Sequence, residues 1–384
     1  MTYFTIAVDR TVGGAVFSFF PKRKSEKPRS ALTMTKARFE HWAAPRLLEV
    51  FVTLGLARKL SAPDEKTFML GKFVWDEAIA QGIEVWEWRL FGLPRNTFVA
   101  KLRNGTRIAY EGIPTVPEKE NRVSWMDDKA ELKKEFTRRG LPVAKGGAAH
   151  TEKEALKIFR SLTPPVIVKP HAGSGSRHTV LHLSTEEDFI RAFRIAKQVD
   201  PYVVIEEEFF GTVFRVTVVD GKFVAALHRD PPLVVGDGVH TIAELVTEEN
   251  KHPLRKGPYF GPIQTGEKAE AELAWQGYTM ESIPEVGQKV SLHQKINWHV
   301  GGTTTDVTDI VHPENKALFE KVARTLQTSI VGIDCIFTDI TKPWTEQERC
   351  GILECNSMPF FENHHLPFHG SPQNVAAKVW EMVS

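Results

Sequence analysis

Two short runs of apolar and β-branched residues near the C-terminal end of the chain predict neighbouring β-strands, Ile330–Phe337 and residues 351–355. Successive side chains of a strand point to opposite faces, so Asp334 and Glu354 can share one face with Asn356. Three oxygen ligands that converge in this way suit a hard cation such as Mg²⁺. The alternative is that the two acids are solvent-facing charges of an edge strand, and the spacing alone favours neither interpretation.

The first part of the chain has the pattern of a small α/β domain. Alternation predicts one or two strands within residues 3–20, and apolar residues at helical spacing predict a helix over 35–56. A second helix is predicted over 66–81, followed by strands at 83–89, 96–103 and 107–110. We place this domain at residues 1–124 and find no catalytic motif in it.

From about residue 125 the pattern predicts a second, larger domain. Asp127 or Asp128 can cap a helix that reaches Gly140, and Thr151 can cap the next helix. Strands are predicted beyond these helices at residues 165–170, from residue 202, at 214–219 and at 222–228. The last two form a hairpin, so the domain contains antiparallel pairing.

A lysine followed by a loop of small residues points to phosphate binding. Lys169 lies near the end of a buried strand, and residues 171–177 are rich in glycine and serine. Backbone N–H groups of such a loop can surround phosphate oxygens, while the lysine supplies compensating charge. The segment lacks the Gly-Lys-Ser/Thr ending and the helix of a P-loop, and a glycine loop between strands is more often only a hairpin.

Two further features suit a nucleotide or an anion. The acidic and aromatic segment 207–210 follows a strand, and such a linker can offer backbone groups to an adenine edge. Arg215 and Arg229 lie at strand positions, where a planar guanidinium suits phosphate or carboxylate. For either arginine alone, a surface salt bridge is the favoured interpretation.

Composition narrows the class of protein. The chain has 384 residues, 42% of them hydrophobic and 25% charged, and a formal net charge of +1, which does not favour a nucleic-acid partner. No apolar run reaches the roughly 18–20 residues of a membrane span, and the N-terminus lacks a signal-peptide pattern. Cys335, Cys350 and Cys355 lack metal-site spacing. We therefore expect a cytoplasmic protein of two or three domains with reduced cysteines and no membrane partner.

Ordered motifs from about Trp125 onward resemble the ATP-grasp ligases, and among them most closely the ATP-grasp domains of cyanophycin synthetase and bifunctional glutathione synthetase. The matching segments are 204–215, 234–246, 250–255, 277–278, 301–309, 312–315, 332–334 and 354–359. The resemblance implies an α/β fold with α+β lobes, in which an N-terminal α/β domain precedes an ATP-grasp domain at 125–384. Its small nucleotide-binding lobe would be 125–203 and its large lobe 204–384.

The resemblance also implies roles for individual residues. The groups expected to bind the nucleotide are Lys129, Lys169, Gly173, Ser174, Gly175, Ser176, Glu207, Glu208, Phe209 and Phe210. Asp334, Glu354 and Asn356 match the ligands of Mg²⁺, for which Mn²⁺ is a possible substitute. The expected catalytic residues are Lys169 and Arg229, the latter stabilising the transferred phosphoryl group or a tetrahedral intermediate.

The implied reaction joins a carboxylate to an amine at the expense of ATP, through an acyl phosphate. The expected substrates are amino acids or short peptides, joined once by a freestanding enzyme; a ligase of ribosomal or polymeric peptides and a non-catalytic ATP-binding protein are the alternatives. The sequence does not define the oligomeric state of the protein, and a homo-oligomer is one of the open alternatives. Departures from the relatives' motifs, such as Val213 and Phe360, point to a different specificity. The expected substrate-facing residues are Arg215, Asn297, Trp298, His299, Gly301, Gly302 and Phe360.

Overall fold

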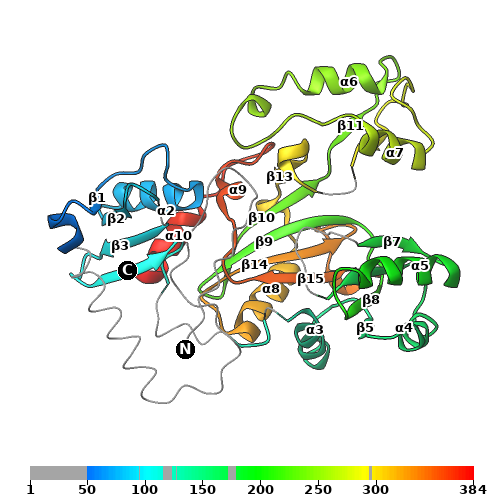
Figure 1. The fold of residues 1–384 in the computed structure, drawn as a ribbon, viewed down its shortest axis with the longest axis horizontal. Helices are drawn as coiled ribbons and strands as arrows, with labels where there is room; N and C mark the ends of the chain where they lie inside the picture. The colour runs from blue at the N-terminus through cyan, green and yellow to red at the C-terminus, as the bar shows by residue number, and fades with distance from the viewer. Residues whose placement is uncertain (1–49, 95, 116–122, 127, 172–178, 294–295) are drawn as a thin grey trace. The chain divides into compact units, whose positions relative to one another are not determined.

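The computed structural model describes residues 50–94, 96–115, 123–126, 128–171, 179–293 and 296–384 (Figure 1). These residues form two compact units, one up to residue 115 together with 376–384, the other from 123 to 375. The predicted strands within 3–20 and most of the helix predicted over 35–56 lie outside the described residues, as do Asp127, Gly173, Ser174, Gly175 and Ser176. Residues 50–53, near the end of that helix, are helical.

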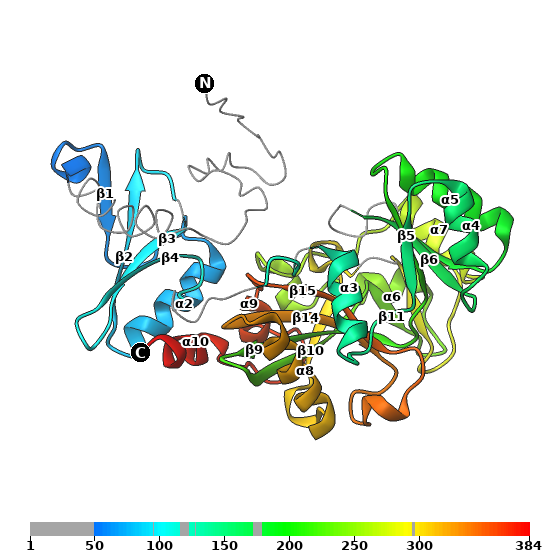
Figure 2. The same cartoon turned by 90° about the horizontal axis from the view of Figure 1, so that it is seen from below.

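The first unit is an antiparallel sheet with helices beside it (Figure 2). The strand order is β1-β2-β3-β4, with bounds Ala57–Leu60, Glu84–Leu90, Thr97–Lys101 and Arg107–Glu111. Its helices are α2, Met69–Ala80, and α10, Val375–Val383. The helix predicted over 66–81 and the strands predicted at 83–89, 96–103 and 107–110 are confirmed, with each end within three residues of its predicted position. Their hydrophobic periodicity and their turn residues both indicate the same bounds.

An aromatic cluster forms the core of this unit. The ring of Phe98 stacks on Tyr110 at 5.4 Å between centroids, and Trp75 meets Phe98 edge-on at 5.5 Å. From α10, Trp380 meets Tyr110 edge-on at 5.9 Å, and its Nε1 donates a 2.7 Å hydrogen bond to the carbonyl oxygen of Val74. The C-terminal helix is therefore part of the first core, a long-range contact that local sequence patterns do not reveal.

Replacing Trp380 with alanine is expected to lower the free energy of unfolding of the first unit by about 3–5 kcal/mol, because the fully buried ring leaves a cavity. Trp380→Phe keeps most of the ring and serves as the control, with a smaller expected loss. Urea unfolding with hydrogen exchange of the β3 amides measures both. Equal protection of β3 in the alanine variant and the wild type would contradict this assignment of α10.

A five-stranded antiparallel sheet lies at the centre of the second unit, with the order β13-β10-β9-β14-β15 among the described strands (Figure 1). In chain order, β9 is Thr212–Val219, β10 Lys222–Asp230, β13 Thr303–Asp306, β14 Ile330–Phe337 and β15 Gly351–Asn356. Two helices supply residues to the core on one face of the sheet, α3, Lys129–Arg138, and α8, Pro313–Leu326. The predicted hairpin and strand pair are confirmed.

The register of this sheet separates an apolar face from a polar one. Asp334 is opposite Arg215 on one side and Glu354 on the other, and Gly332 is opposite Asn356. Leu227 is opposite Arg215, so Arg229, two residues further along, faces the same way. The intervening residues Val216, Ile333 and Cys355 belong to the buried core. We call the side of the sheet that carries Arg215, Arg229, Asp334, Glu354 and Asn356 the polar face.

A second antiparallel sheet has the order β5-β8-β6-β7. Its strands are β5, Gly146–Ala149, β6, Val166–Pro170, β7, Val180–Leu183, and β8, Val203–Glu207. Helices α4, Glu152–Phe159, and α5, Glu186–Lys197, pack on it (Figure 1). Thr151 caps α4 in a reciprocal arrangement with Glu154, and Phe159 stacks on Phe189 at 4.5 Å.

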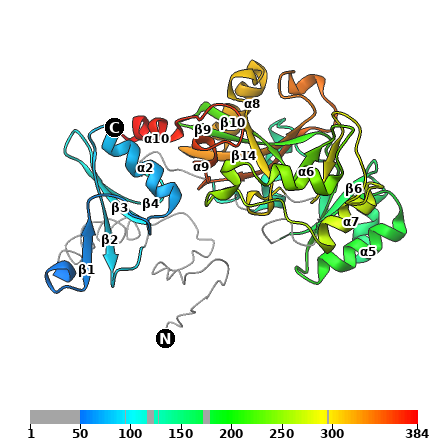
Figure 3. The ribbon, with the colours of Figure 1, turned by 90° about the horizontal axis from the view of Figure 1, so that it is seen from above.

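A third layer of the second unit contains the paired strands β11, Leu233–Val235, and β12, Lys289–Ser291, with helices α6, Ile242–Glu249, and α7, Glu267–Trp275 (Figure 3). The remaining short helices are η2, Pro253–Lys256, η3, Trp298–Val300, η4, Thr308–Ile310, η5, Trp344–Glu346, and α9, Glu362–His365. Within the part of the chain that the structure describes, no helix has the length and apolar character of a membrane span. The three cysteines are free and buried.

Candidate active site

The centre of the polar face is Asp334, a buried carboxylate between two arginines. The Nε and Nη2 atoms of Arg215 lie 2.5 and 2.9 Å from its two oxygens, and Nη1 of Arg229 lies 3.4 Å from Oδ1. Burial by itself raises the pKa of Asp334, but the positive charges of Arg215 and then Arg229 outweigh this effect and lower it. Asp334 is therefore ionised in the folded protein. It is also buried on an inner strand of the sheet, so it is not a solvent-facing charge of an edge strand.

Glu354 and Asn356 lie beside Asp334, as the sequence predicts. Glu354 is the cross-strand partner of Asp334, so the two carboxyl groups lie on the same face of the sheet. The Nδ2 atom of Asn356 is buried and has no hydrogen-bond partner among the described residues. That nitrogen is a hydrogen-bond donor and not a metal ligand, whereas the two carboxylates and the amide oxygen of Asn356 are the oxygen ligands that a hard divalent cation takes.

This donor set is small for a metal site made by protein alone. Among the described residues, no group of three or more His, Cys, Asp or Glu side chains is arranged to hold a metal ion. A cation bound by Asp334, Glu354 and Asn356 would take its remaining ligands from water or from phosphate oxygens, as Mg²⁺ does in phosphate-binding sites. The metal role of these three residues stays a prediction.

Arg229 differs from Arg215 in how much of its hydrogen-bonding capacity is used. Arg215 makes a two-pronged contact with Asp334, whereas Arg229 makes one long contact, and its buried Nε has no partner among the described residues. The guanidinium carbon of Arg229 lies 5.7 Å from the ring centroid of Trp298. Burial lowers the pKa of Arg229, yet an arginine remains charged in proteins. Arg229 is thus positioned to bind an anion.

The segment that carries Trp298 is held by its own backbone. The side chain of Asn297 accepts a 2.8 Å hydrogen bond from the N–H of His299, and the N–H of Gly302 donates to the Asn297 carbonyl at 2.9 Å. At Gly301 the φ angle is +109°, and a Cβ there would lie 2.5 Å from the Cα of Ile263. These contacts fix the conformation of the turn. Of the predicted substrate-facing residues in the turn, Trp298 is the one that contacts Arg229.

The other predicted substrate-facing residues are not brought to Asp334 by any described contact. Asn297 and His299 are exposed, and Phe360 is 62% exposed. The carbonyl of Gly301 accepts a 3.0 Å hydrogen bond from Nη1 of the buried Arg255. Their role in substrate binding stays a prediction.

A second charged centre lies at Glu206, where two lysines meet. Nζ of Lys169 lies 2.9 Å from Oε2 of Glu206, and Lys133 of α3 forms an ion pair with Oε1. Burial acts to raise the pKa of Glu206, but Lys169 and Lys133 lower it to about 2. The predicted Lys169 is therefore held next to a fixed negative charge.

The sequence analysis missed Lys133. Lys133 lies four residues after Lys129 in the sequence of α3, and this i, i+4 helical spacing is the signal that points to it. Lys129 is the first residue of α3, and its predicted contact with phosphate stays a prediction.

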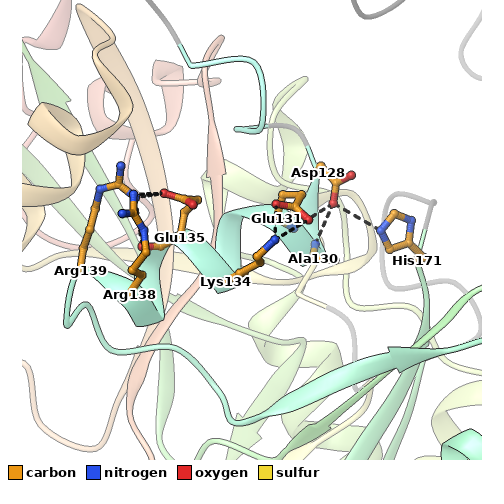
Figure 4. A network of polar contacts seen from close by, with 8 residues as sticks. All are labelled: Asp128, Ala130, Glu131, Lys134, Glu135, Arg138, Arg139 and His171. Carbon is orange, nitrogen blue, oxygen red and sulfur yellow. Dashed lines mark hydrogen bonds and ion pairs between the residues drawn. The ribbon is translucent and has the colours of Figure 1, made fainter.

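The start of α3 is tied to the end of strand β6, as Figure 4 shows. Oδ1 of Asp128 accepts hydrogen bonds from the N–H groups of Ala130 and Glu131, at 2.9 and 3.1 Å, and lies 3.5 Å from Nε2 of His171. His171 directly follows β6, which carries Lys169. The contact brings the helix end that carries Lys129 to the strand end that carries the second predicted phosphate lysine.

The acids of the predicted adenine linker have structural partners. Oε1 of Glu207 accepts a 3.0 Å hydrogen bond from the N–H of Thr163, and Glu208 binds both the N–H and the Nδ1 of His182 at 2.9 Å. The N–H of Phe210 donates to the carbonyl of Arg349 at 3.0 Å. The contact of residues 207–210, Phe209 included, with a base stays a prediction.

Comparisons with known proteins identify relatives over two thirds or more of the chain. No model of a known protein family matches the chain. The sequence is 34% identical over 262 residues to cyanophycin synthetase of Trichormus variabilis, which covers 67% of this chain and 29% of that protein. It is 31% identical over 290 residues to the glutathione biosynthesis bifunctional protein GshAB of Clostridium perfringens, covering 73% of this chain and 37% of that protein.

A solved structure is also similar. The crystal structure of a bifunctional glutathione synthetase from Pasteurella multocida matches with a TM-score of 0.62 and 26% identity, covering 82% of this chain and 43% of that one. The chain thus spans less than half the length of each of these relatives.

Proposed function

Because the chain belongs to the ATP-grasp family and has the mixed helix and sheet fold that its sequence predicts, we propose that it is an ATP-dependent carboxylate–amine ligase. Its substrates in this proposal are amino acids or short peptides, and its products are an amide, ADP and phosphate. The observation that carries the proposal is the polar face, where Asp334, Glu354 and Asn356 lie beside Arg215 and Arg229.

The reaction balances in two steps. An oxygen of the substrate carboxylate attacks the γ-phosphorus of ATP, the bond from that phosphorus to the bridging oxygen of ADP breaks, and an acyl phosphate forms. The nitrogen of the amine then attacks the acyl carbon, inorganic phosphate leaves, and the nitrogen loses a proton. Both steps develop negative charge on phosphate oxygens, so fixed positive groups aimed at that charge accelerate them.

This chain's residues provide such groups on two sides. In the proposal, Arg229 donates its unused Nε–H to the transferred phosphoryl group or to the tetrahedral intermediate, and Arg215 holds Asp334 in place. Lys169, Lys133 and the helix end at Lys129 compensate the charge of the polyphosphate. A divalent cation held by Asp334, Glu354 and Asn356 would neutralise phosphate charge; we propose Mg²⁺, with Mn²⁺ as a substitute.

An intracellular location is part of the proposal. ATP is available there, and Cys335, Cys350 and Cys355 are free thiols, as expected for a reducing compartment.

The proposal is tested by incubating the protein with ATP, Mg²⁺ and a panel of amino acids, dipeptides and longer peptides. Phosphate release and ADP formation report the first step, and mass spectrometry identifies the product. We expect release that depends on a substrate carboxylate and an amide product with a mass loss of one water. A protein that binds ATP but releases no phosphate with any member of the panel would be a binding protein instead. A product found only with the longer peptides would identify a peptide-modifying ligase.

A further inference from the structure

A short helix packs against the polar face and begins with an acidic residue. Helix α9 starts at Glu362, which follows the fully buried Phe361. Two residues further on, His364 is fully buried, and its Nε2 lies 2.9 Å from Oγ1 of Thr217 on β9. Thr217 is two residues from Arg215 and so lies on the same side of the sheet. This contact fixes the position of α9, and with it that of Glu362.

Glu362 is partly buried, and one of its carboxylate oxygens is buried without a hydrogen-bond donor. Its Oε2 atom has no hydrogen-bond partner among the described residues. Arg215 is close enough to interact electrostatically with Glu362, but the fork of Arg215 is occupied by Asp334. An unsatisfied buried carboxylate oxygen costs stability, so its presence in the folded protein points to a ligand that supplies the missing donor.

A second unpartnered group lies near the same carboxylate. The hydroxyl of Tyr259 is buried and has no partner among the described residues. Burial raises the pKa of Tyr259, and the negative charge of Glu362 raises it further, so the two side chains lie within range of an electrostatic interaction. A carboxylate and a phenol oxygen together offer acceptors to a group with several N–H donors. A protonated amino group, with its positive charge and three donors, is the chemical complement.

Building on the proposed ligase function, we propose that Glu362, with Tyr259 beside it, receives the free ammonium group of the amino acid or peptide substrate. Glu362 would then be a specificity-determining residue. It selects substrates with a free, cationic amino group over N-acylated analogues of the same size. Glu362 lies outside the segments that match the relatives' motifs, and the signal that identifies it is its unsatisfied oxygen.

The test compares the wild type with Glu362→Gln, which keeps the size of the side chain and removes its charge. The exposed Glu187→Gln is the matched control. The probes are the free amino acids and dipeptides that support phosphate release, each paired with its N-acetyl derivative. For the free amines, Glu362→Gln should lower kcat/KM about tenfold or more, mainly by raising KM, with the KM for ATP unchanged. For any N-acetyl derivative that reacts, the change should stay under about twofold.

The outcomes separate this inference from the proposed function. If Glu362→Gln affects free and N-acetylated substrates equally, or affects neither, the role of Glu362 is wrong while the ligase activity stands. If the wild type releases no phosphate with any probe, the function fails. The inference is then decided by thermal shifts with a non-hydrolysable ATP analogue, Mg²⁺ and each amino acid. Shifts present in the wild type and lost in Glu362→Gln support it, and equal shifts overturn it.

The stability of the same variant gives an independent prediction. Burial raises the pKa of Glu362 from 4.5 to about 7, with Arg215 acting in the opposite direction and Tyr259 nearby. Between these pH values the folded state keeps a proton that the unfolded state has lost, so this group's contribution to stability falls as pH rises from 4.5 to 7. Glu362→Gln should therefore gain stability relative to the wild type over that interval. Urea unfolding at pH 5 and pH 8 measures the difference, and parallel behaviour of the two proteins would contradict it.

Discussion

Replacing Glu354 with glutamine is expected to abolish ligation while the folded structure and nucleotide binding remain. Glutamine has the size of glutamate, so the strand pair of β14 and β15 is kept, but one of the two carboxylates opposite each other on the polar face loses its charge. Charge stabilisation at a phosphoryl-transfer site is worth large factors, and we expect the rate to fall by about a thousandfold or more. Phosphate release in a single turnover, with saturating ATP, measures the loss.

The control for Glu354→Gln is Glu346→Gln, an exposed glutamate in η5 on the loop that joins the same two strands. This variant should keep wild-type activity. Retention of activity within about tenfold by Glu354→Gln would show that this carboxylate is not part of the charge-neutralising site. Unfolding curves of both variants establish that any loss is not a loss of fold.

Replacing Arg229 with lysine is expected to lower kcat by about a hundredfold or more, because the ammonium group cannot reproduce the donor geometry of the guanidinium at the transferred phosphoryl group. Little stability should be lost, since Arg229 makes only one 3.4 Å contact with Asp334. Steady-state kcat at saturating ATP and urea unfolding are the two measurements.

Arg215→Lys is the matched comparison for Arg229→Lys. Arg215 holds Asp334 through two parallel contacts in a largely buried position, so losing the fork should cost about 1–3 kcal/mol of folding free energy. Its effect on kcat should be smaller than that of Arg229→Lys. The reverse order of the two effects on kcat would assign the phosphoryl contact to Arg215.

Local patterns predict much of the second unit. Strand β14 is found with the bounds expected from its apolar run, Ile330–Phe337, and the hairpin of β9 and β10 turns at Asp220 and Gly221 as predicted. The shared face of Asp334, Glu354 and Asn356 follows from strand alternation once the two strands pair opposite each other, and the observed register provides this. These features depend on neighbours that are close in sequence or on one strand pairing.

Long-range partners were not predictable in the same way. Arg215 and Arg229, which contact Asp334, are 119 and 105 residues away from it in the sequence. The periodicity of apolar residues within one element does not predict contacts at such separations. Glu206 was expected only as part of a strand, yet it binds Lys169 and Lys133 from two other elements. The family resemblance predicts the nucleotide side of the site from ordered motifs, whereas Glu362 lies outside those motifs and is found only from the packing of the structure.

The aromatic core of the first unit implies an order of events during synthesis. Its final member, Trp380, is synthesised after the whole of the second unit, whereas β1 to β4 are synthesised before it. The second unit is continuous in sequence from residue 123 to 375 and contains all the residues of its own core clusters. The second unit of a nascent chain can therefore fold before Trp380 is available to the core of the first unit. Translation pauses before residue 380, or truncations that remove α10, should leave the first unit more open to proteases than the second.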